Sequence, residues 1–263
     1  MEQFQNKVVW ITGASSGIGE AMAKAFNAEG AIVIISSRRR EELERVKALC
    51  SKPEKVHVFP LDLTKFESIS EVSKEVLAKF NIDILFNNGG ISQRSLTAET
   101  SIENDRKIFE VNYFGHVQMT KAVLPQMLAR KSGHIVTISS LSGKWGFYLR
   151  SAYSAAKHAL HGFFESLRME VEDEGIRVTL VTPGFIATEI SKHALDKYGN
   201  PTGEMDNNQA KGISTEECAR QILAGIAAGK DEFGVGGKEM RALFLHRYFP
   251  KLFKKILKRQ AAR

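Results

Sequence analysis

The chain has 263 residues, 43% of them hydrophobic and 25% charged, which is enough for one large α/β domain with a substantial core. No run of about 18 apolar residues occurs, and the N-terminus passes from polar residues into a short apolar run and then glycine, so we expect neither a spanning helix nor a signal peptide. The two cysteines, Cys50 and Cys218, lack metal-ligand spacing, which argues against a disulfide framework or a metal site and favours a cytoplasmic location.

The formal net charge of +7 is concentrated at one end of the chain. Residues 238–263 contain nine Lys or Arg and one Glu, giving +8, so residues 1–237 carry 7 − 8 = −1. A nearly neutral body argues against nucleic-acid binding. We therefore predict a main domain over residues 1–237 and a basic C-terminal extension over residues 238–263.

Short apolar runs, each the length of a buried strand, alternate with longer segments of helical periodicity. The expected strands are residues 7–11, 31–35, 56–59, 82–86, 134–138 and 177–181, with a seventh near 231–237. The expected helices are 19–30, 41–50, 68–80 and a stretch over 102–130. This alternation requires crossover connections, and it predicts a single-domain, Rossmann-like α/β fold: a doubly wound parallel sheet of about seven strands with helices on both faces.

One long segment, residues 189–213, is polar and has no clear periodicity. A long irregular segment inside a compact domain is typical of a lid or a binding loop. We therefore expect it to contribute to substrate binding.

The first predicted strand leads into TGASSGIGEAMAKAF, where Gly13, Gly17 and Gly19 precede a helix. Glycines at such a turn let the backbone approach a phosphate closely, and the helix N-terminus offers free N–H groups and a positive dipole end to it. Their place at the first strand-to-helix turn of an α/β chain favours a dinucleotide site over a purely structural turn.

At the end of the second predicted strand, Ser37 and Arg38 stand where an acidic residue would hold the ribose hydroxyls of NAD(H). Arg38 can pair with a 2′-phosphate and Ser37 leaves room for it, so we favour NADP(H) as the cofactor, with NAD(H) as the alternative. Arg39 and Arg40 fit the solvated start of the next helix.

In SAYSAAKHAL, residues 151–160, Tyr153 and Lys157 are four positions apart, so on a helix both side chains share one face. An isolated pair of this kind is usually an ordinary surface pair. The alternative is that the ammonium lowers the pKa of the phenol from about 10 towards neutrality, so that the phenol exchanges a proton during a reaction. The rest of the chain decides between the two.

These segments together resemble the short-chain dehydrogenase/reductase (SDR) family over roughly residues 5–237. TGASSGIG resembles the family's cofactor motif, and LDLT at 61–64 resembles the segment that contacts the adenine. NNGG at 87–90 is similar to the family's Asn-Asn-Ala-Gly, with Gly89 in place of Ala, and PGFIATE at 183–189 resembles the loop that touches the nicotinamide. VNYFG, ISSLSG and YSAAK resemble the segments that supply the catalytic tetrad, here Asn112, Ser140, Tyr153 and Lys157.

The resemblance implies a role for each tetrad residue. Tyr153 would be the general acid/base, and Lys157 would depress its pKa and hold the nicotinamide ribose. Ser140, thirteen residues before Tyr153 as in the family, would polarise the substrate oxygen, and Asn112 would anchor a water that relays protons to Lys157. The implied cofactor-binding residues are Gly13, Ser15, Ser16, Gly17, Ile18, Gly19, Ser37, Arg38, Asp62, Leu63, Asn88, Gly89, Gly90, Tyr153, Lys157, Pro183, Gly184, Ile186 and Thr188.

The resemblance thus implies an enzyme that interconverts a carbonyl and an alcohol with NADP(H), with reduction as the usual direction, in a homodimer or homotetramer. The alternative from another class is a non-catalytic NADPH-binding redox sensor or scaffold, which has no need of all four tetrad residues. The candidate pocket residues, which could equally be core or dimer packing, are Ser142, Trp145, Phe147, Tyr148 and Phe185. They suggest a small hydrophobic substrate.

The C-terminal segment 241–263 combines apolar and basic residues. Leu252, Phe253, Ile256 and Leu257 fall on one helical stripe, with Lys and Arg largely around the rest. One interpretation is an amphipathic helix in peripheral contact with the anionic inner face of a membrane. The other is a helix that packs on its own body or on a partner subunit, and both stay open at this point. The seven histidines show no metal-ligand spacing and are expected to be structural or surface residues.

Overall fold

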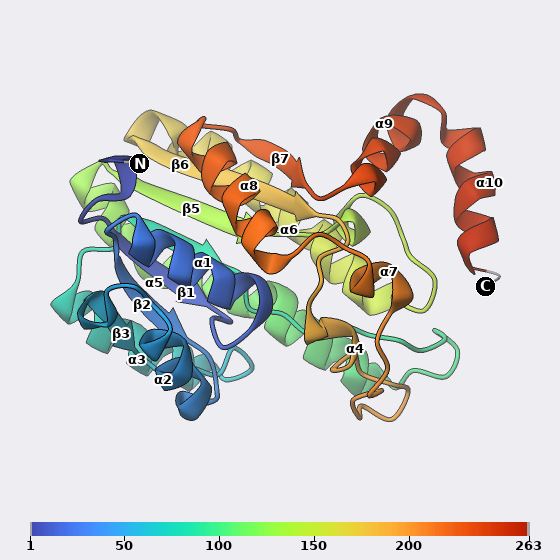
Figure 1. The fold of residues 1–263 in the computed structure, drawn as a ribbon, viewed down its shortest axis with the longest axis horizontal. Coiled ribbons are helices and arrows are strands. Elements are labelled where there is room, and N and C mark those ends of the chain that lie inside the picture. Colours follow the sequence, from blue (N-terminus) through green and yellow to red (C-terminus); the bar gives the residue numbers. More distant parts are fainter. Residues whose placement is uncertain (1, 262–263) are drawn as a thin grey trace.

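A seven-stranded, entirely parallel sheet forms the centre of the protein (Figure 1). The structure is a computed structural model, and it describes residues 2–261. The strand order is β3-β2-β1-β4-β5-β6-β7. The strands are β1 (Val8–Thr12), β2 (Ile32–Ser36), β3 (Val56–Val58), β4 (Ile84–Asn87), β5 (Gly133–Ile138), β6 (Ile176–Pro183) and β7 (Glu232–Val235). The predicted fold class is confirmed.

Helices cover both faces of the sheet because successive side chains of each strand point to opposite faces. Val9 and Ile11 of β1 pack towards α1 (Gly17–Ala28), α2 (Arg40–Ala48) and α8 (Thr215–Ala227). Trp10, between them, packs on the opposite face, which is covered by α3 (Phe66–Lys79), α5 (Gly115–Arg130) and α6 (Ser151–Val171). Two buried cores therefore lie on either side of one sheet.

The chain reverses its winding direction between β1 and β4, which are neighbours in the sheet. A crevice outside the carboxyl ends of the strands is the usual ligand site at such a point. The glycine turn follows β1, the NNGG segment follows β4, and Ser140 follows β5, so the topology gathers these segments at one edge.

The expected binding loop 189–213 begins with a 3₁₀ turn, Glu189–Ser191, and contains the short helix α7 (Asn207–Ala210). Two isolated bridges tie it to the body, one from Ile186 to Ile213 and one from Gln93 to Leu195. The loop is therefore held across the crevice at both its ends.

The C-terminal extension forms two helices, α9 (Arg241–Tyr248) and α10 (Pro250–Ala261), at the edge of the molecule (Figure 1). Phe253 of α10 is buried against Leu141 and Trp145, in a cluster that also contacts Leu257. Leu252 and Ile256 are exposed, so the structure divides the predicted apolar stripe between the protein body and solvent. Within residues 2–261, no helix has the length and apolar character that a membrane crossing requires.

Candidate active site

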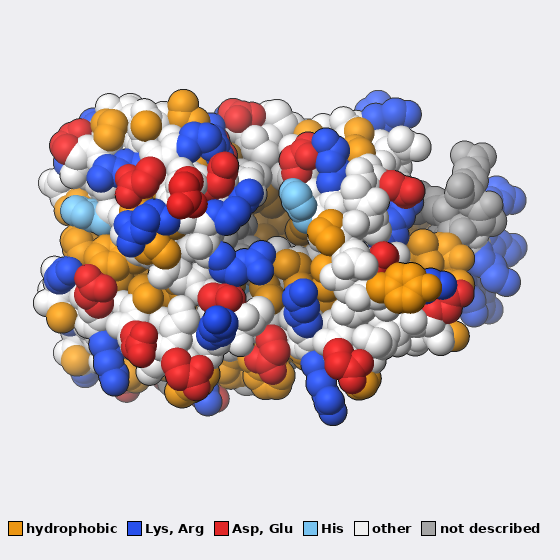
Figure 2. All heavy atoms as spheres, turned by 90° about the horizontal axis from the view of Figure 1, so that it is seen from below, with side chains coloured by type: hydrophobic (Ala, Val, Ile, Leu, Met, Phe, Trp, Pro, Cys, Tyr) orange, Lys and Arg blue, Asp and Glu red, His pale blue; other side chains and the backbone are white. Residues whose placement is uncertain are grey.

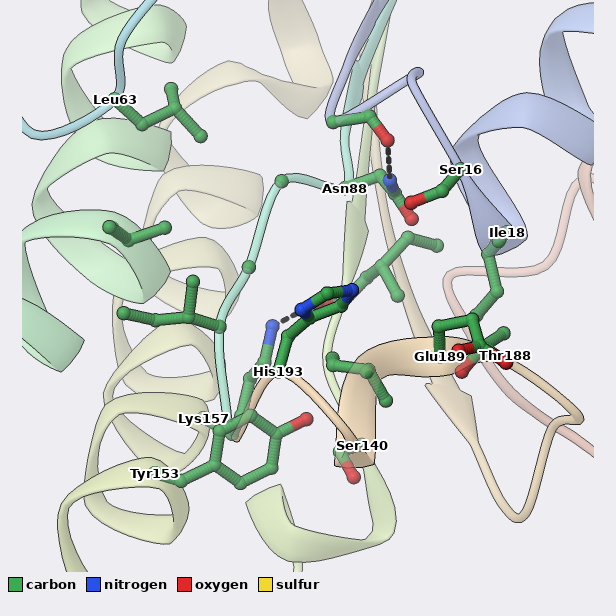
Figure 3. Close-up of a pocket in the computed structure, with 18 of the residues that line it drawn as sticks. Ser16, Ile18, Leu63, Asn88, Ser140, Tyr153, Lys157, Thr188, Glu189 and His193 are labelled. Atoms are coloured by element: carbon green, nitrogen blue, oxygen red, sulfur yellow. Dashed lines mark hydrogen bonds between the residues drawn. The ribbon is translucent and has the colours of Figure 1, made fainter. Parts of the chain in front are cut away.

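A cavity of about 590 Å³ occupies the carboxyl edge of the sheet (Figure 3). Figure 3 shows Tyr153 and Lys157 from α6 close to Ser140 at one end, while Ser16 and Asn88 lie at the other. The predicted residues that line it are Gly13, Ser15, Ser16, Gly17, Ile18, Ser37, Arg38, Asp62, Leu63, Asn88, Gly89, Gly90, Ser140, Ser142, Phe147, Tyr153, Lys157, Pro183, Gly184, Phe185, Ile186 and Thr188. Residues 175 positions apart in the sequence therefore share one cavity wall.

Four of the predicted residues are not among those that line the cavity. Gly19 lies beneath the glycine turn, where an added Cβ would come 2.8 Å from the carbonyl carbon of Gly13. Asn112 is fully buried behind the wall. Trp145 is buried against the C-terminal helices instead, and Tyr148 is 57% exposed. The pocket therefore keeps Phe147 and Phe185 as its aromatic candidates.

The glycine turn and the NNGG segment are fastened to each other by hydrogen bonds. Thr12 Oγ1 accepts from the N–H groups of both Asn88 and Gly89, each at 3.1 Å. Asn88 Nδ2 donates to the carbonyl of Gly13 at 3.2 Å. A Cβ on Gly13, whose φ is +66°, would lie 2.6 Å from Gly89 Cα, so glycine is required for this close approach. The glycine turn and the NNGG segment together form the floor of the cavity.

His116 supports this floor, through a contact that the sequence does not indicate because its partner is a backbone atom. The side chain is completely buried, and its Nε2 donates to the Gly89 carbonyl at 2.6 Å. Burial lowers the pKa of His116 to about 3, with Lys157 as the second cause. His116 is therefore a neutral, structural histidine.

Asn112 lies in a π-helical segment, Glu110–Phe114, between α4 (Ile102–Phe109) and α5. Such local widening of a helix is frequent at functional sites. The Asn112 Nδ2 donates to the Ile91 carbonyl at 2.8 Å, and the Ile91 N–H donates back to Oδ1 at 2.9 Å. Asn112 thereby fixes the chain that follows the NNGG segment.

Lys157 is buried on α6, and its Nζ donates to the carbonyl of Ile138 at the end of β5, at 2.8 Å. Its ammonium lies 5.9 Å from the centre of the Tyr153 ring. Burial lowers the pKa of Lys157 to about 7, because the charged form loses its hydration. This side chain therefore exchanges its proton near neutral pH.

Burial is also the largest influence on Tyr153, and it raises the pKa of the phenol above its ordinary value. The charge of Arg150 and the hydrogen bond with Ser140 oppose this effect and are weaker. The direction is opposite to the one expected from the sequence, since desolvation outweighs the nearby charges and Arg150, not Lys157, is the opposing charge. Tyr153 is accordingly a protonated hydrogen-bond donor at neutral pH.

Gln93 places the tetrad helix. Its Oε1 accepts from the N–H of Ala152 at 3.0 Å, in the first turn of α6, and its Nε2 donates to Ser95 and Thr100 at 3.3 Å each. Free N–H groups of a first helical turn need such acceptors when they are buried. No local sequence pattern indicates the contact with α6, because Ala152 lies 59 residues away from Gln93.

The cavity wall contains several residues that the sequence interpretation did not single out. Arg150 and Lys107 add positive charge, and His193 and Leu195 come from the expected binding loop 189–213. Arg150 also donates to Asp206 at 3.2 Å, which ties α6 to that loop. The polarity of the loop pointed to its involvement, although not to these side chains.

Ser37 and Arg38 line the cavity where a nucleotide ribose is expected. The Ser37 hydroxyl is buried and has no hydrogen-bond partner among the described residues, which fits a site built for a ligand oxygen. Arg39, expected to be merely solvated, also lines the wall, whereas Arg40 pairs with Glu44 at 3.9 Å. The residues present therefore fit a nicotinamide dinucleotide.

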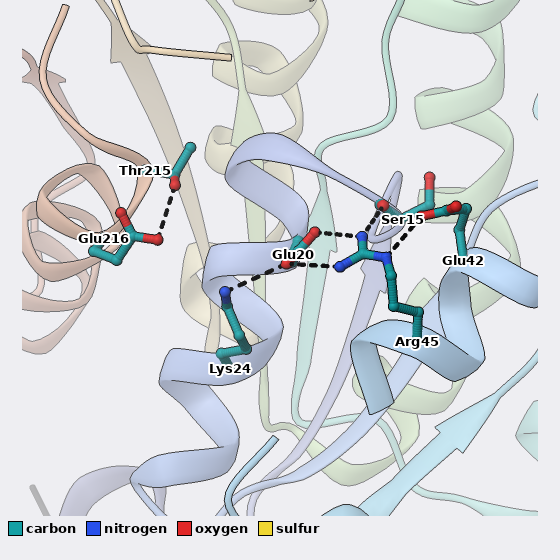
Figure 4. A network of polar contacts seen from close by, with 7 residues as sticks. All are labelled: Ser15, Glu20, Lys24, Glu42, Arg45, Thr215 and Glu216. Atoms are coloured by element: carbon teal, nitrogen blue, oxygen red, sulfur yellow. Dashed lines mark hydrogen bonds and ion pairs between the residues drawn. The ribbon is translucent and has the colours of Figure 1, made fainter. Parts of the chain in front are cut away.

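Arg45 is committed to a structural role nearby (Figure 4). It donates to the backbone carbonyl of Ser15 at 3.1 Å and to Glu20 at 2.7 Å, which joins α2 to the glycine turn. The hydrogen bond with Arg45 holds the pKa of Glu20 below its ordinary value. At the end of β2, Arg38 and Arg39, rather than Arg45, are thus the cations that line the cavity.

A second polar cluster lies next to Ser139, whose Oγ is 2.9 Å from His161 Nε2. The ligand atoms of His161, Glu165 and Glu232 lie within 4.8 Å of one another, a grouping that could hold a metal ion. The Lys144 ammonium already lies 2.6 Å from Glu232 and 3.2 Å from His161 Nδ1. We interpret this cluster as an ion-pair network.

Residues 7–199 match the family model described as short chain dehydrogenase. The chain belongs to the short-chain dehydrogenase/reductase family. It is 44% identical to a Drosophila melanogaster dehydrogenase/reductase SDR family protein 7-like, over 99% of this chain and 82% of the relative. Among solved structures, a short-chain dehydrogenase from Streptomyces avermitilis is 33% identical, with a TM-score of 0.82 over 98% of this chain and 97% of that one.

A short-chain dehydrogenase from Sphingobium yanoikuyae, solved in complex with NADPH, is 25% identical, with a TM-score of 0.76 over 87% of each chain. Family membership makes this protein an oxidoreductase of the CH–OH/C=O type that uses a nicotinamide cofactor. Family membership does not decide between NAD and NADP as the cofactor.

Proposed function

We propose that this SDR protein interconverts a carbonyl and an alcohol with NADP(H), using Tyr153 as the general acid/base, on a small hydrophobic substrate. The observation that carries the proposal is the placement of Ser140, Tyr153 and Lys157 around one cavity, together with the unpartnered hydroxyl of Ser37 in its wall. A non-catalytic NADPH sensor would need only the Ser37 hydroxyl and not the other three residues.

The reaction divides between the cofactor and the chain. The nicotinamide, when bound, supplies or accepts the hydride. Tyr153, whose phenol is kept protonated by burial, donates its proton to the developing alkoxide during reduction. Ser140, beside it, donates a hydrogen bond to the same substrate oxygen.

Lys157 replaces the proton that Tyr153 gives up. Its pKa of about 7 means that charged and neutral forms are both populated at neutral pH. Asn112, which already holds the backbone of Ile91, is the residue that we propose to anchor the relay water. The four residues thus share one proton path from the cavity to Lys157.

The choice of NADP over NAD rests on Ser37 and Arg38. Both line the cavity at the end of β2, and Arg38 has no acidic partner within 4 Å among the described residues. A free guanidinium matches a 2′-phosphate in charge and geometry. An acidic side chain there would repel it.

The partners proposed for this protein are the carbonyl or alcohol substrate and a second copy of the chain, as a homodimer or homotetramer. Ile102 and Phe114, at the two ends of the α4 region, are 56% and 50% exposed and offer apolar surface to another subunit. We also propose residues 1–237 as the catalytic domain and 238–263 as an accessory extension. A cytoplasmic location, peripheral at a membrane, is proposed with it.

The deciding experiment first titrates the purified protein with NADPH and, separately, with NADH to compare their affinities. Consumption of the reduced cofactor is then followed by its absorbance in the presence of hydrophobic aldehydes, ketones and quinones. We expect tighter binding of NADPH and its consumption with at least one compound. Tyr153→Phe should keep NADPH binding and lose about 10²- to 10⁴-fold in turnover. Full turnover by this variant would refute the role of Tyr153, and tight binding without any consumption would favour the sensor.

A further inference from the structure

The outer side of α9 and α10 is an apolar surface embedded in positive charge. Phe244, Tyr248, Phe249, Leu252 and Ile256 are each between 38% and 60% exposed. Phe244 lies 4.8 Å from Tyr248 and 6.0 Å from Phe249, measured between ring centres, so the three aromatic rings form one patch. Large apolar side chains gathered in this way mark a contact surface.

The helix α10 has two distinct faces. Phe253 and Leu257, one turn apart, contact the body at Trp145 and its neighbours. Leu252, Lys255, Ile256 and Arg259 are spaced i, i+3, i+4 and i+7, so they form a second stripe, and all four are exposed. We call these four residues the outer stripe. It alternates apolar with cationic side chains.

The charge around the outer stripe has a single sign. Residues 241–261 contain seven Lys or Arg and no Asp or Glu. Figure 2 shows Lys and Arg side chains along the end of the molecule where α10 lies in Figure 1. The surface is therefore complementary to an anionic partner.

We infer that α9 and α10 bind the surface of an anionic lipid bilayer, with the outer stripe and the aromatic patch at the interface. A bilayer accepts apolar side chains between its headgroups and attracts cations to its charged lipids, so it satisfies both halves of the stripe. A second copy of this surface would bring like charges together, and a nucleic acid would leave the apolar side chains without a partner.

The inner face of α10 connects this contact to the cavity. The Phe253 ring lies 4.8 Å from the Trp145 ring, and Trp145 lies 5.8 Å from Phe147, which lines the cavity. Bilayer binding therefore brings a wall of the pocket next to the lipid phase. This step rests on the proposed function, and it assigns the substrate to compounds that partition into membranes.

The inference is tested by sedimenting the purified protein with phosphatidylcholine vesicles, with and without phosphatidylserine. We expect binding to the anionic vesicles that weakens with salt. Lys255→Gln with Arg259→Gln should weaken binding about 25-fold, since each cation near such a surface contributes roughly fivefold. Leu252→Glu should weaken it by a similar factor, because it removes apolar insertion and adds a negative charge.

Matched control variants carry the same kinds of substitution on other surfaces of the protein. Leu49→Glu alters a leucine that is 55% exposed on the body, and Lys74→Gln with Lys121→Gln removes two charges from α3 and α5. Both should leave vesicle binding unchanged. Melting by circular dichroism and NADPH binding verify that every variant is folded, so a failure here leaves the proposed reaction untouched.

Several results would overturn the inference. Absence of binding to anionic vesicles does so directly, as does equal weakening by the controls. Binding that depends on Lys255 and Arg259 but not on Leu252 indicates a polyanion such as nucleic acid. Conversion of an oligomer to a monomer by Leu252→Glu, seen by sedimentation velocity, indicates a subunit interface.

The inference that the substrate partitions into membranes is tested separately. Leu252→Glu should slow reduction of a long-chain aldehyde carried in anionic vesicles and leave a short, water-soluble aldehyde unaffected. Equal rates on vesicle-borne aldehyde refute delivery from the bilayer, whereas inactivity of the wild type on both compounds refutes the proposed function instead.

Discussion

The buried ammonium of Lys157 makes the stability of the fold depend on pH. Its pKa is about 7 in the folded protein, against an ordinary value of 10.5. Below pH 7 the folded and unfolded chains both hold the proton, so the full cost of burying the charge is present. Above pH 7 the folded chain releases it first, so stability rises with pH up to about 10.5, by about 1.4 kcal/mol per unit.

Replacing Lys157 with Met should remove this dependence. Between pH 6 and pH 9, the wild type should gain about 2 to 3 kcal/mol of unfolding free energy relative to Lys157→Met, nearly all of it above pH 7. Urea denaturation at several pH values measures the difference, and Lys74→Met, on the exposed side of α3, is the matched control. Parallel pH profiles of wild type and Lys157→Met would show that the ammonium stays charged when buried, and would refute the argument.

Three further predictions concern the cofactor site and its frame. Arg38→Asp should weaken NADPH binding about 10- to 150-fold and change NADH binding little, as measured by fluorescence titration. Gly13→Ala should lower the unfolding free energy, measured by urea denaturation, by more than about 1 kcal/mol. Gly162→Ala should raise it by about 0.5 to 1 kcal/mol, because Gly162 lies inside α6 and an added Cβ meets nothing within 4 Å. Asn112→Leu should cost about 2 to 4 kcal/mol in the same assay, because it leaves the backbone N–H and C=O of the half-buried Ile91 without their Asn112 partner. An unchanged midpoint would contradict that.

The fold could be predicted because buried parallel strands are continuous apolar runs. The expected strands 7–11 and 134–138 correspond to Val8–Thr12 and Gly133–Ile138, a shift of one residue at most. The stretch 102–130 was expected to be helical, and the structure interrupts it with the π-helical segment around Asn112. Apolar periodicity does not reveal one extra residue within a turn, since the flanking helices keep their own pattern.

The cavity residues could be predicted where they sit in contiguous motifs, as Tyr153 and Lys157 do. Gln93 and His116 could not, because each acts on a backbone atom that only the tertiary fold brings near. For Trp145 the sequence leaves pocket wall and core packing open; it packs on Phe253, more than a hundred residues later, since the C-terminal helix folds back over it. Long-range contacts of this kind leave no local trace in the sequence.

The spacing of Tyr153 and Lys157 in the sequence does not predict the direction of the Tyr153 pKa shift. A phenol four residues from an ammonium shares its face of the helix, but the same burial that brings them together removes water from both. Burial therefore raises the pKa of Tyr153 and lowers that of Lys157, so the two values, similar in water, move apart in the folded protein. A proton donor that stays loaded, next to a base that titrates near neutrality, suits reduction: Tyr153 gives its proton to the substrate oxygen, and Lys157 restores it.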